Sequence, residues 1–140
     1  MTPVQIYVAQ LLALVALSLL TGLAILIGRG FDILRNGRSL RFYEDFDGVS
    51  TLALVTRPTR QLANQFEYPV LFFTLTAIAI AVPVENSWLA GLGWCYVALR
   101  WTHALIHLTL NRLYLRTPVF MTSNIVLLVM WVIFGVEVLA

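Results

Sequence analysis

Apolar residues fall into four long runs along the chain, at about residues 4–27, 63–82, 88–110 and 119–139. A helix needs about 20 predominantly apolar residues to cross the hydrocarbon core of a bilayer, and each run reaches that length. Turn-forming residues join the later runs through short connections, whereas residues 28–59 form a long first loop. The pattern therefore predicts a bundle of four transmembrane helices.

The composition supports this interpretation. Hydrophobic residues make up 60% of the chain and charged residues 11%, which is far more apolar than a soluble domain. We expect one all-α membrane domain over residues 1–140, with the first run retained because it lacks the basic start of a signal peptide. Cys95 is the only cysteine, which excludes an intrachain disulfide and a two-cysteine redox or metal motif. A net charge of +2 without a basic stripe argues against nucleic-acid binding.

The arginines are distributed unevenly between the two sides of the predicted bundle. The first and third connections and the start of the second helix hold Arg29, Arg35, Arg38, Arg41, Arg57, Arg60, Arg112 and Arg116. Neither terminus nor the second connection contains Lys or Arg. By the positive-inside rule, the long loop with its acidic patch around Asp45 should be cytoplasmic. Both termini should then face the periplasm of a bacterial inner membrane.

Polar residues interrupt two of the predicted spans at helical spacing. They are Arg60, Asn64, Glu67 and Tyr68 in the second run and Arg100, His103 and His107 in the third. Residues at i, i+3 or i+4, and i+7 share one face of an α-helix. A charge inside hydrocarbon costs roughly 2.5 to 3.5 kcal/mol on insertion scales, so such residues normally face a polar cavity or partner. The two sets therefore mark a candidate site.

Two plainer explanations of this cluster are open. Glu67 and Arg100 could pair between helices simply as a packing device. His103 and His107, four residues apart, could bind a metal, but no third ligand is evident and we expect none to be bound. The remaining donors and acceptors exceed the needs of one ion pair, which favours a charged, polar ligand.

The polar segments resemble those of a known family. Residues 60–69, RQLANQFEYP, resemble the second-helix signature of the MAPEG superfamily, the membrane-associated proteins in eicosanoid and glutathione metabolism. Residues 100–109, RWTHALIHLT, resemble the third-helix signature of its microsomal glutathione transferases. The resemblance implies a homotrimer that binds glutathione, as co-substrate, between subunits near the cytoplasmic face. It assigns glutathione binding to Arg60, Asn64, Glu67, Tyr68, Arg100, His103 and His107.

The resemblance also implies an activity, that of a glutathione transferase or peroxidase acting on lipophilic small molecules that arrive from the bilayer. Catalysis needs the thiolate of glutathione, which a nearby arginine stabilises. The family spacing from Arg100 leads to Tyr114, so the candidates for that catalytic role are Arg112 and Arg116, on either side of it. The alternative is a non-catalytic MAPEG-like scaffold or an accessory subunit of a larger membrane complex.

Overall fold

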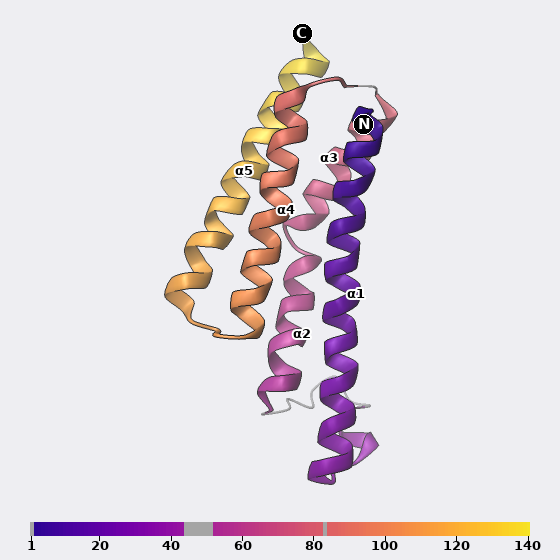
Figure 1. Cartoon of the computed structure of the whole chain (residues 1–140), viewed down its shortest axis with the longest axis vertical. Coiled ribbons are helices and arrows are strands. Elements are labelled where there is room, and N and C mark those ends of the chain that lie inside the picture. The colour runs from indigo at the N-terminus through magenta and orange to yellow at the C-terminus, as the bar shows by residue number, and fades with distance from the viewer. Residues whose placement is uncertain (1, 44–51, 83) are drawn as a thin grey trace.

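The computed structural model describes residues 2–43, 52–82 and 84–140. They form α1 (Pro3–Asn36), the short 3-10 helix η1 (Leu40–Tyr43), α2 (Ala53–Gln65), α3 (Pro69–Ala81), α4 (Ser87–Leu108) and α5 (Leu113–Leu139) (Figure 1). The described residues contain no strand, which confirms the all-α prediction. The acidic patch around Asp45 lies outside the described residues.

Helix α1 is longer than its apolar run. It starts at a capping box in which the Thr2 hydroxyl accepts from the Gln5 backbone and the Gln5 side chain accepts from the Thr2 backbone. It ends where Gly37 adopts a left-handed conformation, with φ of 66°. The predicted end at residue 27 was wrong because apolar residues mark only part of the helix. The turn signal at residues 35–38 marks the true end, and the loop predicted at 28–59 is correspondingly shorter.

The predicted second helix at 63–82 is two helices, α2 and α3, with a break at residues 66–68. Pro69 causes this break in part, because it has no N–H with which to continue the helical hydrogen bonds. The Phe66 N–H instead donates to the Ala63 carbonyl in a tight last turn, at 3.0 Å. Helix α2 also starts at Ala53, ten residues before the predicted start at residue 63 and within the segment expected to be loop.

The last two helices form a hairpin. Helix α4 agrees closely with its prediction and is capped by Asn86, whose side chain accepts from the backbone N–H groups of Trp88 and Leu89. Asn111 has a φ of 50° in the short connection to α5. Helix α5 begins at Leu113 rather than near residue 119. Arg116 therefore lies on a helix and not in the predicted loop.

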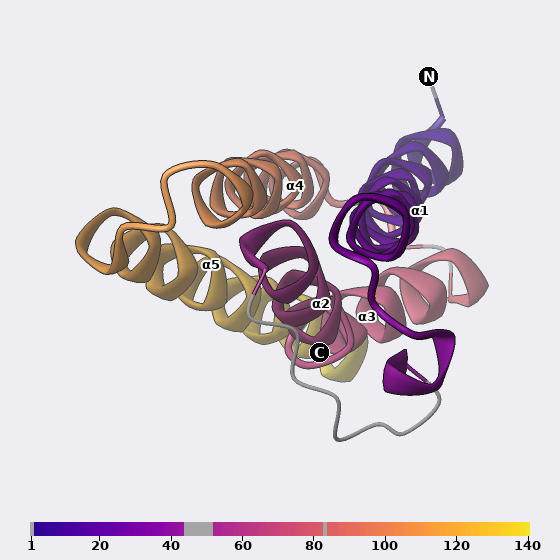
Figure 2. The same ribbon diagram turned by 90° about the horizontal axis from the view of Figure 1, so that it is seen from below.

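The helices pack lengthwise around a shared apolar core. Figure 1 places both termini at the same end of the bundle, and Figure 2 shows α2 and α3 between α1 and α5. Among the described residues, the large apolar side chains buried in this core include Tyr7, Leu14, Phe72, Leu75, Leu89, Tyr96, Leu127 and Met130. This core fixes α4 against its neighbours, and Arg100, His103 and His107 of α4 are buried along with it.

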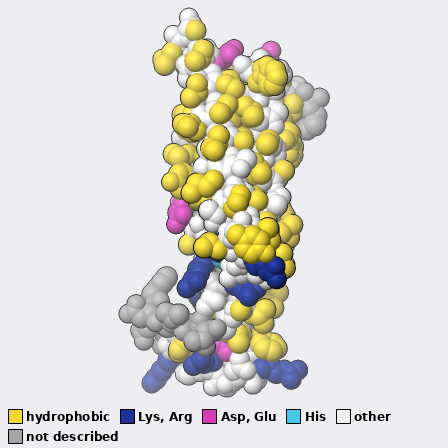
Figure 3. All heavy atoms as spheres, turned by 90° about the vertical axis from the view of Figure 1, so that its left-hand side faces the viewer, with side chains coloured by type: hydrophobic (Ala, Val, Ile, Leu, Met, Phe, Trp, Pro, Cys, Tyr) yellow, Lys and Arg dark blue, Asp and Glu magenta, His cyan; other side chains and the backbone are white. Residues whose placement is uncertain are grey.

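Among the described helices, α1 and α5 are long and apolar enough, by length and composition, to cross a membrane individually. Neither α2 nor α3, each of 13 residues, is long enough to span a bilayer alone at about 1.5 Å of rise per residue. In Figure 3 hydrophobic side chains cover most of the visible face, and the arginines gather toward the end away from the termini. This separation of apolar and basic surface is what a membrane-embedded bundle requires.

Candidate functional site

The candidate site begins with Arg100, which lies on α4 and is fully buried. Its Nη2 donates to the backbone carbonyl of Asn64 at 3.1 Å, close to the point where α2 ends. The last carbonyls of any helix lack intrahelical partners, so Arg100 supplies a donor that the broken helix needs. Its Nε and Nη1 are buried and have no hydrogen-bond partner among the residues that the structure describes. Buried polar groups are normally hydrogen-bonded, so a buried guanidinium with two unpartnered donor atoms favours the binding of an acceptor beside it.

The two histidines continue this line of polar groups along α4. His103 and His107 are each 2% exposed, and their ring centroids lie 5.9 Å apart. The Nδ1 atom of each ring is buried without a hydrogen-bond partner. Among the residues that the structure describes, no three side chains of His, Cys, Asp or Glu come together as a metal site would need.

Phe120, on α5, packs against three of the predicted site residues. Its ring centroid lies 5.6 Å from the guanidinium carbon of Arg100, 5.5 Å from the ring of His103 and 5.7 Å from that of Tyr68. The contact with Arg100 is a cation–π interaction. Sequence reasoning missed Phe120, because one more aromatic residue in an apolar run gives no signal.

A small cavity of about 170 Å³ opens beside these groups. It is lined by Asn64, His103, Arg116, Thr117 and Phe120. The structure thus brings residues of α2, α4 and α5 together at one point. We call the cavity and the buried Arg100 beside it the polar cleft.

The two candidate catalytic arginines differ in position. Arg116 is half-buried and lines the polar cleft, and its Nη1 donates to the Asn111 side-chain oxygen at 3.0 Å. Arg112 is exposed and donates from its Nη1 to the Tyr114 hydroxyl at 2.8 Å. The residues lining the cavity therefore include Arg116 and not Arg112.

Five of the seven predicted binding residues do not line the cavity; two of them, Arg100 and His107, are buried on α4, and the other three are exposed. Arg60 is exposed on α2, and Glu67 and Tyr68 are exposed in the break before α3. Glu67 forms no ion pair with Arg100, and the one ion pair among the described residues joins Arg38 to Asp32. The pairing of Glu67 with Arg100 as a packing device is therefore not what the single chain adopts.

Three other polar residues of α2 with notable surroundings were not predicted as site residues. Gln61 and Gln65 are fully buried on α2, and both polar atoms of each side-chain amide have no partner. Their spacing of four residues is the signal that could have found them. Arg57 is half-buried and its Nη1 donates to the carbonyls of Thr109 at 2.5 Å and Leu108 at 3.5 Å, at the end of α4.

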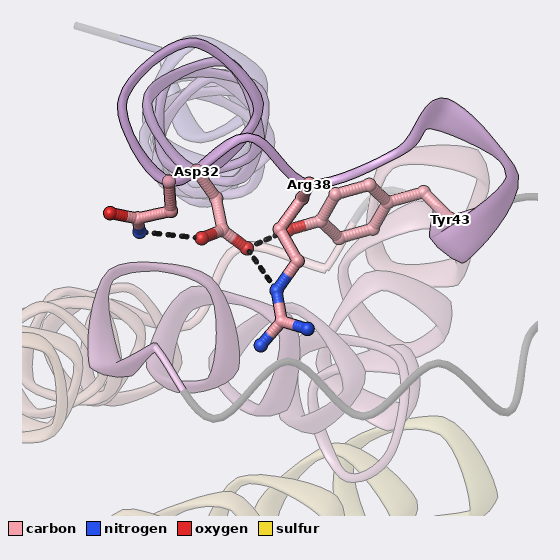
Figure 4. Close-up of polar contacts among 4 residues, drawn as sticks. Asp32, Arg38 and Tyr43 are labelled. Atoms are coloured by element: carbon pink, nitrogen blue, oxygen red, sulfur yellow. Dashed lines mark hydrogen bonds and ion pairs between the residues drawn. The ribbon is translucent and has the colours of Figure 1, made fainter.

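A second polar group, which we call the α1-end cluster, lies outside the cleft and comprises Asp32, Asn36, Arg38 and Tyr43 (Figure 4). The buried Asp32 carboxylate accepts from the Asn36 side chain at 2.7 Å and from the Tyr43 hydroxyl at 2.5 Å. The Nε of Arg38 lies 3.7 Å from the same carboxylate. The cluster ties η1 back to the end of α1, and its acceptors are occupied by groups of the protein itself.

Comparison with known proteins identifies the family of the chain. The model of the MAPEG family matches residues 4–136, nearly the whole chain. No curated protein and no solved structure gives a significant match. The match takes in both polar segments and all five α-helices except the last residues of α5 and the first of α1. The chain therefore belongs to the MAPEG family, the membrane proteins associated with eicosanoid and glutathione metabolism.

Proposed function

We propose that the protein is an integral membrane glutathione transferase or peroxidase whose polar cleft binds glutathione and presents its thiol to lipophilic electrophiles. The observation that carries this proposal is the buried guanidinium of Arg100, which has two unpartnered nitrogens next to a cavity lined by Arg116 and His103. Two cationic groups without a carboxylate in contact favour an anionic ligand.

The chemistry of glutathione fits this arrangement. The tripeptide carries two carboxylates, one ammonium group and a thiol. Arginine can bind a carboxylate in bidentate fashion, so the free donors of Arg100 suit one carboxylate. Asn64 adds an amide at the cavity wall, and the exposed carboxylate of Glu67 is available for the ammonium group. His103 and His107 supply further donors or acceptors along α4.

The size of the cavity supports a trimer. A volume of about 170 Å³ is below the range of roughly 300 to 1,000 Å³ that is common for small-molecule pockets. Arg60, Glu67 and Tyr68 are exposed in the single chain, although Tyr68 packs against Phe120 at the cavity wall. A neighbouring subunit placed against this face would enlarge the site and enclose them. We therefore propose a homotrimer with one cleft at each subunit boundary.

Arg116 is the better of the two catalytic candidates because it lines the cleft. In conjugation the thiol loses its proton, the thiolate sulfur attacks the electrophilic carbon, and the new C–S bond forms as the leaving group departs with its electron pair. A guanidinium beside the sulfur stabilises the thiolate and so raises its share at neutral pH. Arg112 is directed to the Tyr114 hydroxyl, on the exposed side. The arginine-rich end, with the cleft, would face the cytoplasm and both termini the periplasm of a bacterial inner membrane.

A thermal-shift titration in detergent tests the binding step. A ligand that binds only the folded protein stabilises it, by about 2.7 kcal/mol when present at 100 times its Kd. Glutathione and its S-alkyl analogues should raise the melting temperature, whereas cysteine should not. The same preparation should conjugate glutathione to a generic aromatic electrophile, with light scattering reporting three chains. No shift with glutathione together with no turnover would overturn the proposal.

A non-catalytic role as a scaffold or accessory subunit is the second candidate. One observation favours it: Arg100 already completes the hydrogen bonding at the end of α2, which is a structural task. In that case Arg100 variants would lose folded protein and wild type would show no glutathione shift. Co-purification with a larger membrane complex would support the same conclusion.

A further inference from the structure

A second groove lies apart from the polar cleft, between the arginine-rich part of α1 and the first turns of α2. Its volume is about 340 Å³, which falls within the usual range for small-molecule sites. The lining residues are Ala24, Ile27, Gly28, Phe31, Ala53, Leu54, Arg57, Pro58 and Leu108. All but one of these side chains are apolar or absent. We call it the α1–α2 groove, and the cleft described above shares none of its lining residues.

The backbones of α1 and α2 meet at the bottom of this groove. A Cβ atom placed on Gly28 would lie 2.4 Å from the Leu54 carbonyl oxygen, closer than any real contact allows. Only glycine therefore permits this approach of the two helices. The groove above the contact is a small slot, because one turn of a helix about 10 to 12 Å across occupies roughly 400 Å³, more than the groove volume of about 340 Å³. A single flexible hydrocarbon chain fits such a slot better than a protein segment with its own secondary structure.

The groove opens on the lipid-facing side of α1. Ile27 and Phe31, one helical turn apart on its rim, are 64% and 45% exposed. They extend the exposed apolar surface that Leu19 and Leu23 form higher on the same helix. Exposed apolar side chains that continue a membrane-facing surface favour contact with lipid over contact with water. The occupant should therefore come from the bilayer.

The positive charge at this groove favours an anionic lipid. Arg57 lines the groove, and its hydrogen bonds to protein carbonyls come from one nitrogen, Nη1. The rest of its half-buried guanidinium is available to an anion. Among the described residues the same end of the bundle also holds Arg35, Arg38 and Arg41, all exposed, against the single carboxylate of Asp32. An apolar slot with a cation at its rim complements an acyl chain joined to an anionic headgroup.

We propose that the α1–α2 groove is a binding site for an anionic phospholipid, with one acyl chain between α1 and α2 and the phosphate on Arg57. This site is separate from glutathione binding and does not depend on it. Bound lipid would hold α1 and α2 together near residues 37–52, the longest connection between consecutive α-helices of the chain.

Lipid titration of the delipidated full-length protein in detergent tests this site. Phosphatidylglycerol should be retained in native mass spectrometry and raise the melting temperature, and phosphatidylcholine with the same acyl chains should do so far less. Arg57→Gln should weaken phosphatidylglycerol binding by roughly tenfold, the size of one charge-assisted hydrogen bond. Ala53→Phe fills the slot with Arg57 intact and should have an equal or larger effect.

Matched controls keep the interpretation specific. Arg35→Gln removes the same charge from an exposed position outside the groove, and Ala98→Phe adds the same ring to an exposed position on α4. Both should bind phosphatidylglycerol as wild type does. Wild-type-like lipid binding by Ala53→Phe, or equal binding of the two phospholipids by wild type, would overturn the proposal. So would a change of oligomeric mass in Ala53→Phe with lipid retention intact, which would identify the groove as a contact between subunits.

Discussion

The α1-end cluster and the polar cleft are both built around a buried charge, yet they treat it in opposite ways. Both oxygens of Asp32 accept from protein donors, and Arg38 lies beside them. Arg100 makes one hydrogen bond, to a backbone carbonyl, and leaves two buried nitrogens without a partner. Protein interiors rarely leave such groups unsatisfied, since each costs roughly 1 to 3 kcal/mol.

This difference separates a structural charge from one that awaits a ligand. The α1-end cluster is complete within the chain, so its loss should affect stability alone. The polar cleft is incomplete, and its missing acceptors must come from a ligand, water or a neighbouring subunit. Variants in the two regions should therefore divide cleanly between folding and function.

The largest expected effect is on turnover. Arg116→Ala should reduce the rate of glutathione conjugation by roughly 100-fold to 1,000-fold, the usual loss when one group that stabilises developing charge is removed. Glutathione affinity should change little, because the interaction acts mainly in the transition state. Steady-state kinetics beside a thermal-shift titration measure both quantities. Arg112→Ala is the control and should retain the wild-type rate; the reverse result would move the catalytic role to Arg112.

The next effect is on stability. Asp32→Ala should lower the free energy of unfolding by about 1.5 to 3 kcal/mol, the range for hydrogen bonds to a charged group. The side chain of Arg38 is 41% exposed, so its ion pair should add little. Thermal unfolding in detergent measures the loss. Glutathione affinity should be unchanged, and a marked fall in affinity would erase the distinction between the two regions.

A smaller effect is expected in the cleft itself. Arg100→Met removes the unsatisfied charge along with one backbone hydrogen bond, so we expect a stability loss of about 1 kcal/mol or less. Glutathione affinity should fall roughly tenfold, because a charge-assisted contact to a carboxylate is lost. Isothermal titration beside thermal unfolding separates the two outcomes. If Arg100→Met unfolds and the wild-type protein does not bind glutathione, the scaffold role is supported.

The smallest effect concerns Asn111, which accepts from Arg116 and has a φ of 50°. Asn111→Gly retains the backbone conformation and removes the acceptor, and should reduce the conjugation rate only a few-fold, since one such hydrogen bond contributes about 0.5 to 1.5 kcal/mol. Asn111→Asp keeps the acceptor and should keep most of the rate. Equal rates in all three proteins would mean that Arg116 needs no such support.

The sequence predicted the apolar elements better than the points where they start and stop. Hydropathy identified the α4 segment almost to its ends but failed at α1, because the helix continues past Ile27 through residues 28–36, where glycine and charged residues interrupt the apolar run. Pro69 was visible within the predicted second helix, and the break it introduces is the feature that an apolar count overlooks. Helix capping and proline chemistry, rather than hydrophobicity, determine these boundaries.

The sequence predicted the site residues only where charged and polar residues share one face of a helix. Helical spacing placed Arg100, His103 and His107 together, since one helix holds all three. Packing between helices could not be read in the same way. It brings Phe120 and Arg116 of α5 to the cavity, while Arg60 and Glu67 stay outside it in the single chain.

The hydrogen bond from Arg100 to the Asn64 carbonyl constrains position 100 but not the residue type at position 64, since every residue has a backbone carbonyl. Pro69 helps to end α2 where the Asn64 carbonyl is left for Arg100 to satisfy. If a helix-forming residue replaced Pro69, α2 could continue into α3, the Tyr68 N–H would then bond the Asn64 carbonyl four residues earlier, and position 100 would be released from its structural role. Substitutions at positions 69 and 100 should therefore occur in the same homologues. A homologue with a substitution at only one of these positions should have a cleft with a different function.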